Sequence, residues 1–281
     1  MTSTTIHELH DREVLLSLTN VSVSRSKQQI LQNVNLEIKN GEFYGLIGPN
    51  GAGKTTLLKL ILGFISQDEG QIEIGTSTEA RHRLTIGYVP QKIEFDRDIP
   101  LRARDLVALG MDGHKFGIGL FDKKKRALVN DILQAVSAYE FADARIGELS
   151  GGQQQKIMIA HALVSNPKIL LLDEPLANLD LKSQHEVIEL VNKLRTEQDI
   201  SILFSAHDMN PLMDVMDKII YIANGRIAVG KVDEIVTGKN LTFLYGYPVD
   251  VLKYNGRLIV LTGNETEGLH HELHDKKVLS L

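Results

Sequence analysis

The chain has 281 residues, 43% of them hydrophobic, a formal net charge of −5 and no cysteine. Its length allows one large domain with appendages, and its acidic balance argues against general nucleic-acid binding, which needs a basic face. A chain without cysteine has no disulfide or thiolate metal site and suits a reducing cytoplasm. No apolar run approaches the ~20 residues of a membrane helix, and the first 20 residues lack the apolar core of a signal peptide.

The first part of the chain begins with a polar stretch, residues 1–13, and continues with strand-like patterns. Alternating apolar residues predict strands at 14–23 and 34–38, the first only in part. The apolar run 43–47 predicts a buried strand, and residues 56–62 predict a helix. The segment between this strand and this helix carries a motif for phosphate binding.

That segment has the sequence of a phosphate-binding loop: Gly48-Pro49-Asn50-Gly51-Ala52-Gly53-Lys54-Thr55-Thr56. Its glycines let backbone N–H groups converge on phosphate oxygens, and the positive end of the following helix adds to the attraction. Lys54 can reach the terminal phosphates of a nucleotide, and the Thr55 hydroxyl can ligate Mg²⁺. The motif therefore predicts a site for ATP and Mg²⁺.

The rest of the chain alternates strands and helices. Apolar runs predict strands at 71–74, 84–89, 169–172 and 200–204. Helices are predicted from 150 to about 164 and from about 181 to 195. Residues 92–148 are helix-rich and charged, with a loop marked by Gly113, Gly117 and Gly119. This order predicts an α/β fold: a doubly wound, mainly parallel sheet, an antiparallel β region and an inserted helical subdomain at about 92–165.

One apolar strand ends in two adjacent carboxylates, in the run Ile169-Leu170-Leu171-Leu172-Asp173-Glu174-Pro175, which resembles the Walker B motif. Asp173 can support Mg²⁺, partly through water, because this ion keeps much of its hydration shell. Glu174 can orient and deprotonate an attacking water, and a general base of this kind accelerates a reaction ~10²–10⁴-fold. A plain turn at the end of a strand is the alternative, and the catalytic interpretation is favoured.

A second short motif, Leu149-Ser150-Gly151-Gly152-Gln153, follows the phosphate loop by about a hundred residues. With the phosphate loop and the carboxylate strand, it resembles the signature of the ATP-binding cassette (ABC) ATPases. Ser150 can cap the next helix, while Gly151 and Gly152 leave backbone N–H groups open for an anion. The resemblance implies that this helix end binds the γ-phosphate of ATP held by a second cassette, so a homodimer or a paired cassette subunit is expected.

The resemblance covers about residues 14–240 and implies four further roles. Gln91 is similar to the Q-loop glutamine, which ligates Mg²⁺ and senses the γ-phosphate. His207 stands where the family has its switch histidine, which contacts the γ-phosphate and holds the attacking water. Asp180 is similar to the D-loop aspartate, which crosses the dimer interface. Arg25 aligns with an aromatic residue that stacks on adenine, and its guanidinium plane can stack on a base instead.

Several segments are similar to import ATPases of the manganese/zinc type: 86–91, 94–101, 104–110, 207–212 and 244–251. This resemblance implies an ATP-hydrolysing subunit, peripheral on the cytoplasmic face of the membrane. It would energise uptake of a divalent metal ion of the manganese, zinc and iron class through a separate polytopic permease. An extracytoplasmic metal-binding protein would deliver the ion.

An iron-chelate or cobalamin-type importer is the nearest alternative, and a non-transport ABC ATPase is a second. Repair ATPases insert long coiled coils between the two motifs, and here the gap shows no sustained heptads. Translation factors of the family carry two cassettes, and this chain has one. We therefore favour transport.

Residues 241–281 are expected to form a C-terminal appendage. Two apolar, β-rich runs flank Asn255-Gly256, a pair suited to a type I′ turn, so a hairpin is expected at about 248–262. The polar tail beyond it is expected to be mobile. Its histidines, His270, His271 and His274, could bind a Zn²⁺-like ion as neutral imidazoles. A solvated tail without a metal site is the favoured alternative.

Overall fold

The structure is a computed structural model that describes residues 12–26, 28–75, 84–91, 95–112 and 123–262. The loop predicted at Gly113, Gly117 and Gly119 and the tail histidines His270, His271 and His274 lie outside these residues. Within them, no helix has the length and apolar character needed to span a bilayer.

A six-stranded sheet forms the centre of the molecule. In spatial order its strands are β5 (Ile86–Val89), β6 (Ile169–Leu172), β7 (Ser201–Ala206), β3 (Phe43–Ile47), β8 (Lys218–Ala223) and β9 (Arg226–Gly230). The first five are parallel, and β9 runs antiparallel to β8. Every residue of β3, β6 and β7 is buried, as expected for parallel strands covered on both faces. The prediction of a mainly parallel α/β fold is confirmed.

Two apolar cores lie on the two faces of this sheet, because side chains alternate along each strand. On one face Leu170 and Leu172 contact a core built from helices α4 (Gly151–Leu163) and α5 (Leu181–Gln198). On the other face Ile169 and Leu171 contact α1 (Lys54–Ile61) and the antiparallel strands. The strands therefore hold their carboxyl ends rigidly between two layers.

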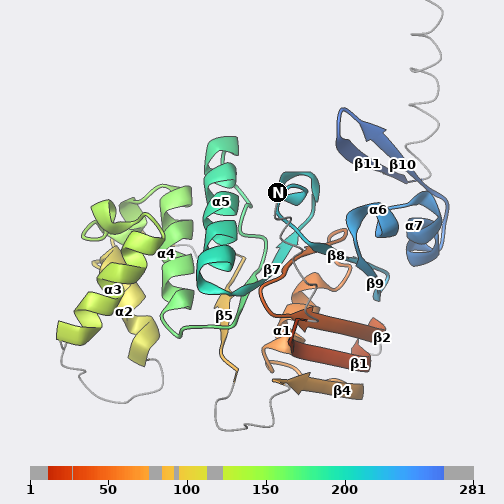
Figure 1. The fold of residues 1–281 in the computed structure, drawn as a ribbon, viewed down its shortest axis with the longest axis horizontal. Helices are drawn as coiled ribbons and strands as arrows, with labels where there is room; N and C mark the ends of the chain where they lie inside the picture. The colour runs from red at the N-terminus through yellow and green to blue at the C-terminus, as the bar shows by residue number, and fades with distance from the viewer. Residues whose placement is uncertain (1–11, 27, 76–83, 92–94, 113–122, 263–281) are drawn as a thin grey trace, which may run out of the picture.

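The predicted antiparallel region is a three-stranded sheet in the order β2-β1-β4. Its strands are β1 (Val14–Arg25), β2 (Gln28–Lys39) and β4 (Glu69–Ile74). Strand β2 starts well before the predicted 34–38 and pairs with β1 along its length. This sheet covers α1, and Figure 1 shows β1, β2 and β4 beside that helix.

The helical insert lies at the opposite end of the longest axis from the C-terminal hairpin (Figure 1). Its helices are α2 (Ala103–Asp112), α3 (Lys123–Ala135), η1 (Tyr139–Phe141), η2 (Ile146–Glu148) and the start of α4. Helix α2 contacts both α3 and α4. The buried residues of these helices belong to the same apolar core as α4, α5 and one face of the central sheet.

The C-terminal region contains elements that sequence patterns missed. These are the hairpin of β8 and β9, then α6 (Val232–Ile235) and α7 (Gly238–Tyr245). Helix α7 crosses residue 240, where we expected the cassette to end, and its Leu241 and Leu244 belong to the main core. The structure therefore has no break at that boundary.

The expected hairpin is present as β10 (Val249–Tyr254) and β11 (Arg257–Thr262). Its turn residues Asn255 and Gly256 have φ of +47° and +78°, as a type I′ turn requires. Val249 is buried, and Val251, Leu258 and Val260 pack against the main core. The hairpin is therefore docked on the body of the cassette.

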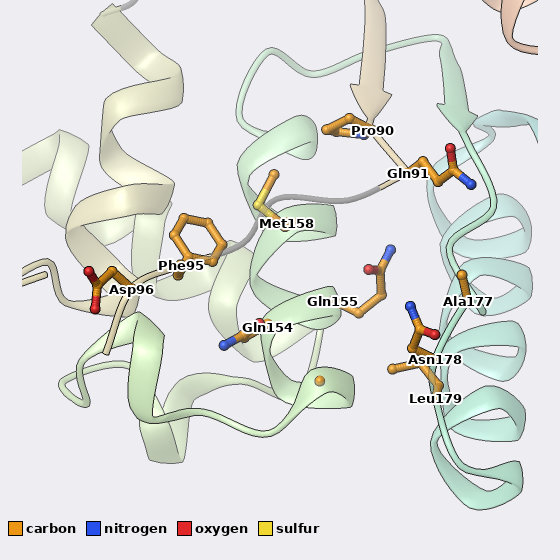
Figure 2. Close-up of a pocket in the computed structure, with 11 residues that line it drawn as sticks. Pro90, Gln91, Phe95, Asp96, Gln154, Gln155, Met158, Ala177, Asn178 and Leu179 are labelled. Carbon is orange, nitrogen blue, oxygen red and sulfur yellow. The ribbon is translucent and has the colours of Figure 1, made fainter. Parts of the chain in front are cut away.

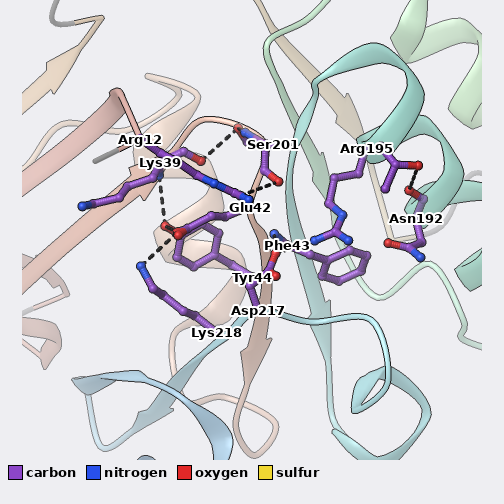
Figure 3. Close-up of polar contacts among 12 residues, drawn as sticks. Arg12, Lys39, Glu42, Phe43, Tyr44, Asn192, Arg195, Ser201, Asp217 and Lys218 are labelled. Carbon is purple, nitrogen blue, oxygen red and sulfur yellow. Dashed lines mark hydrogen bonds and ion pairs between the residues drawn. The ribbon is translucent and has the colours of Figure 1, made fainter. Parts of the chain in front are cut away.

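Polar side chains link the amino ends of the parallel strands (Figure 3). Glu42 accepts hydrogen bonds from the Tyr44 hydroxyl and from Lys218 Nζ, the latter at 3.0 Å. Burial and the Glu42 carboxylate raise the pKa of Tyr44. Ser201 Oγ accepts from the Gly41 N–H at 2.9 Å and donates to the Lys39 carbonyl at 3.1 Å. These contacts fasten β2, β3, β7 and β8 together.

Candidate active site

The predicted phosphate-binding loop joins β3 to α1 at the carboxyl end of the sheet. Gly51 and Gly53 have φ of +79° and +113°, which residues with a Cβ rarely adopt. A Cβ at Gly48 would stand 2.1 Å from the carbonyl oxygen of Ile222. Pro49, Asn50 and Gly51 are exposed, whereas Ala52 and Gly53 are buried. The loop is therefore fixed at both ends and open in its middle.

Lys54 is the first residue of α1 and only 5% exposed. Its Nζ donates to the carbonyl oxygens of Gly48 at 2.8 Å and Pro49 at 3.2 Å, so the ammonium lies inside the curl of the loop. It also lies 3.5 Å from Glu174 Oε1. Thr55 and Thr56 follow it, half-buried, in the first turn of the helix. A cation and the positive end of a helix thus meet at one point, which suits an anion.

The two predicted carboxylates follow β6 and are held by Ser205 of β7. Ser205 Oγ donates to Asp173 Oδ1 at 2.9 Å and accepts the Glu174 N–H at 2.8 Å. Glu174 has a φ of +47°, an uncommon conformation that this bond to its backbone supports. One buried hydroxyl therefore holds both the Asp173 carboxylate and the backbone that carries Glu174.

Two residues from β5 and the segment after it complete this cluster. Gln91 Nε2 donates to Glu174 Oε2 at 2.7 Å, so the predicted Q-loop glutamine and general base are in direct contact. Tyr88 hydrogen-bonds to the Asp173 carboxylate, and burial together with that carboxylate raises the pKa of Tyr88. Asp173 itself is only 2% exposed. The chain thus gathers three strand ends around one pair of acids.

His207 follows β7 and is exposed. It lines a cavity of about 230 Å³ together with Glu174, Ser205, Asp208 and Pro211. The predicted switch histidine and the predicted general base therefore face one space.

The signature segment begins α4 and has the predicted cap. Ser150 Oγ accepts the Gln153 N–H at 3.3 Å, and Gln153 Oε1 accepts the Ser150 N–H at 2.9 Å, which is a capping box. Ser150 and Gly151 are exposed, while Gly152 is buried against Ser183 of α5. Figure 1 shows α4 well apart from α1, so one chain does not bring the signature to its own phosphate loop.

Asp180 caps α5: its carboxylate accepts the Ser183 N–H at 2.9 Å and the Ser183 hydroxyl at 2.8 Å. These hydrogen bonds lower the pKa of Asp180, which is exposed. Lys156 of α4 binds Glu186 of α5 at 2.7 Å and lowers the pKa of that carboxyl. The signature helix and the helix after the D-loop are therefore locked together.

A cavity of about 610 Å³ is lined by α4, by residues 177–179 before α5 and by residues 90, 91, 95 and 96 after β5. In Figure 2 the side chains of Gln155 and Asn178 both lie below Gln91 and extend toward it. Gln155 Nε2 is buried and has no partner among the described residues. The space adjoins both the Gln91 and the Gly151 ends of the site.

Arg25 is exposed at the end of β1, where it pairs in register with Gln28 of β2. The neighbouring Ile30 places its carbonyl oxygen 3.3 Å from a Cβ built on Gly53. This end of the strand pair therefore lies against the phosphate loop. Arg25 would need such a position to contact the base of a bound nucleotide.

The donor set near Asp173 fits a hard divalent cation. A hydroxyl, an amide oxygen and a carboxylate, from Thr55, Gln91 and Asp173, are the oxygen ligands that Mg²⁺ prefers. Asp173 is held by two donors of the chain, which fixes its orientation.

Sequence patterns did not single out Ser205 or Tyr88 as site residues. The sequence does carry a signal for Ser205, because it is the one polar residue in the buried run 202–206. A buried hydroxyl needs a hydrogen-bond partner. Tyr88 had no such signal, since aromatic residues are common in strands.

Comparisons with known proteins agree on one family. The model of the ABC transporter family matches residues 31–177. The manganese transport system ATP-binding protein MntB of Bacillus subtilis is 36% identical over 241 residues, which are 85% of this chain and 95% of that protein.

Two solved structures extend the likeness. One is a chain in an inward-facing conformation of an ABC transporter assigned to the metal-chelate type. It has a TM-score of 0.73 and 28% identity, over 88% of this chain and 96% of that one. The other is the ATP-binding cassette MJ0796, in a dimeric post-hydrolysis state bound to ADP and Pi. It has a TM-score of 0.64 and 30% identity, over 77% of this chain and 98% of that one.

Proposed function

The chain belongs to the ABC transporter family, and we propose that it energises the uptake of a divalent metal ion of the manganese, zinc and iron class. As a member of this family it is an ATP-binding cassette that hydrolyses ATP. The observation that carries the catalytic assignment is the contact of Lys54, inside the phosphate loop, with Glu174 at 3.5 Å.

The proposed catalytic step uses this contact. Lys54 and the backbone N–H groups of residues 50–55 bind the β- and γ-phosphates of ATP. Glu174 takes a proton from a water whose oxygen attacks the γ-phosphorus, and the bond to the ADP oxygen breaks. His207 faces the same cavity as Glu174 and would hold that water and the γ-phosphate. Gln91 is hydrogen-bonded to Glu174 and would move toward a bound nucleotide. Its position would therefore depend on whether ATP is bound.

Mg²⁺ is the proposed cofactor of this step. Thr55, Gln91 and Asp173 would hold the ion, which when bound neutralises charge on the phosphates. Arg25 would stack on the adenine ring.

Two copies of the chain would act together. The open helix end at Ser150, Gly151 and Gly152, with Gln153, would bind the γ-phosphate held by the partner cassette. Asp180 would lie at the same interface. The dimeric state of the MJ0796 cassette supports this arrangement.

A membrane permease is the second proposed partner, because no described helix can span a bilayer and the relatives belong to transport systems. The cassette dimer would bind the cytoplasmic face of this polytopic permease. An extracytoplasmic binding protein would deliver the ion to its other side. Nucleic acid has no place in this proposal.

The cargo is proposed to be manganese in the first instance, because the bacterial relative at 36% identity is a manganese transport ATPase subunit. A chelate importer is the second candidate, since the structural neighbour at a TM-score of 0.73 is assigned to the metal-chelate type. Zinc and iron stay within the proposed class.

Uptake in cells that lack this chain tests the proposal. Cells would be complemented with the wild type, with Glu174→Gln or with Glu42→Gln as a matched control from the amino ends of the strands. We expect manganese uptake, measured beside zinc, iron and an iron chelate, to return with the wild type and Glu42→Gln only. Uptake that stays normal for every free ion in the deletion strain would contradict metal-ion import, and a defect for the chelate alone would favour the second candidate.

A further inference from the structure

The C-terminal hairpin is joined to the segment that follows His207 through one side chain. Asn210 begins η3 (Asn210–Leu212), three residues after His207. Its Nδ2 donates to the Leu258 carbonyl oxygen at 3.0 Å, and its Oδ1 accepts the Leu258 N–H at 2.8 Å. Together these two hydrogen bonds fix the orientation of the Asn210 amide. A flipped amide would place its NH₂ group against the Leu258 N–H, donor against donor.

The backbone groups of Leu258 are free to make these bonds because of the register of the hairpin. Tyr254 and Arg257 are paired next to the two-residue turn, and Lys253 and Leu258 form the next pair. In an antiparallel ladder this second pair does not exchange hydrogen bonds, so its N–H and C=O groups point outward. Asn210 therefore satisfies the backbone N–H and C=O groups at this edge of β11, as a neighbouring strand would.

The same amide also shapes the segment that carries His207. Asp208 Oδ1 accepts the Asn210 N–H at 3.0 Å and Asn210 Nδ2 at 2.7 Å. Asp208 and Pro211 line the cavity that His207 shares with Glu174. The exposed stretch that holds His207 thus has one tether to the core strand β7 and another to the hairpin.

The tether to the hairpin is anchored on both sides. Met209 and Leu212 are 4% and 0% exposed, so the residue before Asn210 and the second residue after it are fixed in the main core. Leu258 and Val260 of β11 pack against that same core. A movement of the hairpin edge would therefore reach the Asp208–Asn210 turn directly.

We infer that the C-terminal hairpin is a positioning element for His207, and that Asn210 couples the two. This inference rests on the proposed ATPase role of His207 and adds a contact at Leu258, which lies 48 residues from Asn210 in the sequence. Asn210 is a positioning residue, since it touches the segment and not the nucleotide.

The test compares Asn210→Ala with Asn224→Gly in the full-length chain. Asn224 also ties the C-terminal region with an amide, donating to the Tyr245 carbonyl at 2.6 Å, and glycine keeps the φ of +47° at its turn. We expect Asn210→Ala to lower kcat about fivefold or more, since small misplacements of site groups cost up to about 10²-fold. The KM for ATP should stay within about twofold, because the phosphate loop is untouched.

Hydrogen exchange supplies the readout that a general loss of stability would not give. Asn210→Ala should speed exchange at 207–212 and at the Leu258 amide, while Asn224→Gly should leave both unchanged and keep the wild-type kcat. Leu258→Pro is the second variant, because it removes the N–H from the hairpin side at an outward edge position where proline is tolerated. It should reproduce the loss of kcat.

Two results would overturn the inference: wild-type kcat in Asn210→Ala and Leu258→Pro, or an equal loss of kcat in Asn224→Gly. A wild-type chain that hydrolyses no ATP would instead overturn the proposed function and this inference with it.

Discussion

At the amino ends of the parallel strands Lys218 pairs with Glu42 at 3.0 Å, and at their carboxyl ends Lys54 lies 3.5 Å from Glu174. Each end also has a fully buried serine of β7 that accepts one N–H and donates to one oxygen. Ser201 does so between Gly41 and Lys39. The two ends of the sheet thus contain the same kinds of group.

The difference lies in what those groups hold. Ser201 bonds to backbone on both sides, and the lysine there stands over the Tyr44 ring as well as beside Glu42. Ser205 instead bonds to the carboxylate of Asp173 and to the backbone of Glu174, whose φ is +47°. The polar groups at the amino end fasten strands together, whereas those at the carboxyl end hold the buried Asp173 and position Glu174 beside a cavity. Position in the fold, more than residue type, separates structural from chemical roles.

Lys54→Ala and Lys218→Ala test this comparison with the largest expected effect. Loss of Lys54 removes the cation inside the phosphate loop, so nucleotide binding should weaken and hydrolysis should be abolished. Loss of Lys218 removes a partly exposed ion pair worth about 1 kcal/mol or less, so the Tm should fall by roughly 2–4 °C at most. Its turnover should stay near the wild-type value.

Calorimetric binding of ATP and a steady-state phosphate assay measure both variants. Equal losses of turnover in the two lysine variants would break the distinction between the ends of the sheet.

Ser205→Ala and Ser201→Ala give a smaller effect and isolate the hydroxyl. Each change leaves buried groups without a partner, which costs about 1–3 kcal/mol, so the two Tm values should fall alike. Only Ser205→Ala should also lower kcat, by about tenfold, because the two acids lose the group that fixes their positions. Thermal unfolding and kcat are measured on the same samples, and a kcat loss that merely follows Tm in both variants would argue for a structural role alone.

Arg25→Tyr has the smallest expected effect and concerns the rim of the carboxyl end. If the exposed Arg25 faces adenine, tyrosine should stack in its place and tighten ATP binding by about 1 kcal/mol, or about fivefold in Kd. Titration of the nucleotide into each form measures this difference. Unchanged affinity would mean that Arg25 points elsewhere and that another side chain holds the base.

The sequence predicts the parts of the site that depend on neighbouring residues. The phosphate loop, the acids after β6 and the cap at Ser150 each adjoin a strand or helix in the sequence. Their local sequence patterns are therefore enough to predict their geometry. The turn at Asn255-Gly256 was found the same way. The identical pair Asn224-Gly225, with φ of +47° and +73°, joins β8 to β9 and carries the same sequence signal for a hairpin turn.

Other features depend on contacts between distant segments and leave weak patterns. The expected boundary at residue 240 followed sequence character, whereas Leu241 and Leu244 of α7 are buried in the main core. The bond of Asn210 to Leu258 joins two segments that only the fold brings together. Ser205 is intermediate between the predictable and the unpredictable features. A buried hydroxyl in an apolar strand indicates that it has a hydrogen-bond partner, but the sequence does not identify that partner.

The most direct measurement of the central claim is the behaviour of Glu174→Gln beside Glu42→Gln in Mg-ATP. Glutamine at 174 keeps the size of the side chain but accepts no proton, so turnover should fall by roughly 10²-fold or more. Size-exclusion chromatography should then show an ATP-stabilised dimer, while Glu42→Gln turns over near the wild-type rate. Wild-type turnover in Glu174→Gln, with only monomer present, would contradict the account.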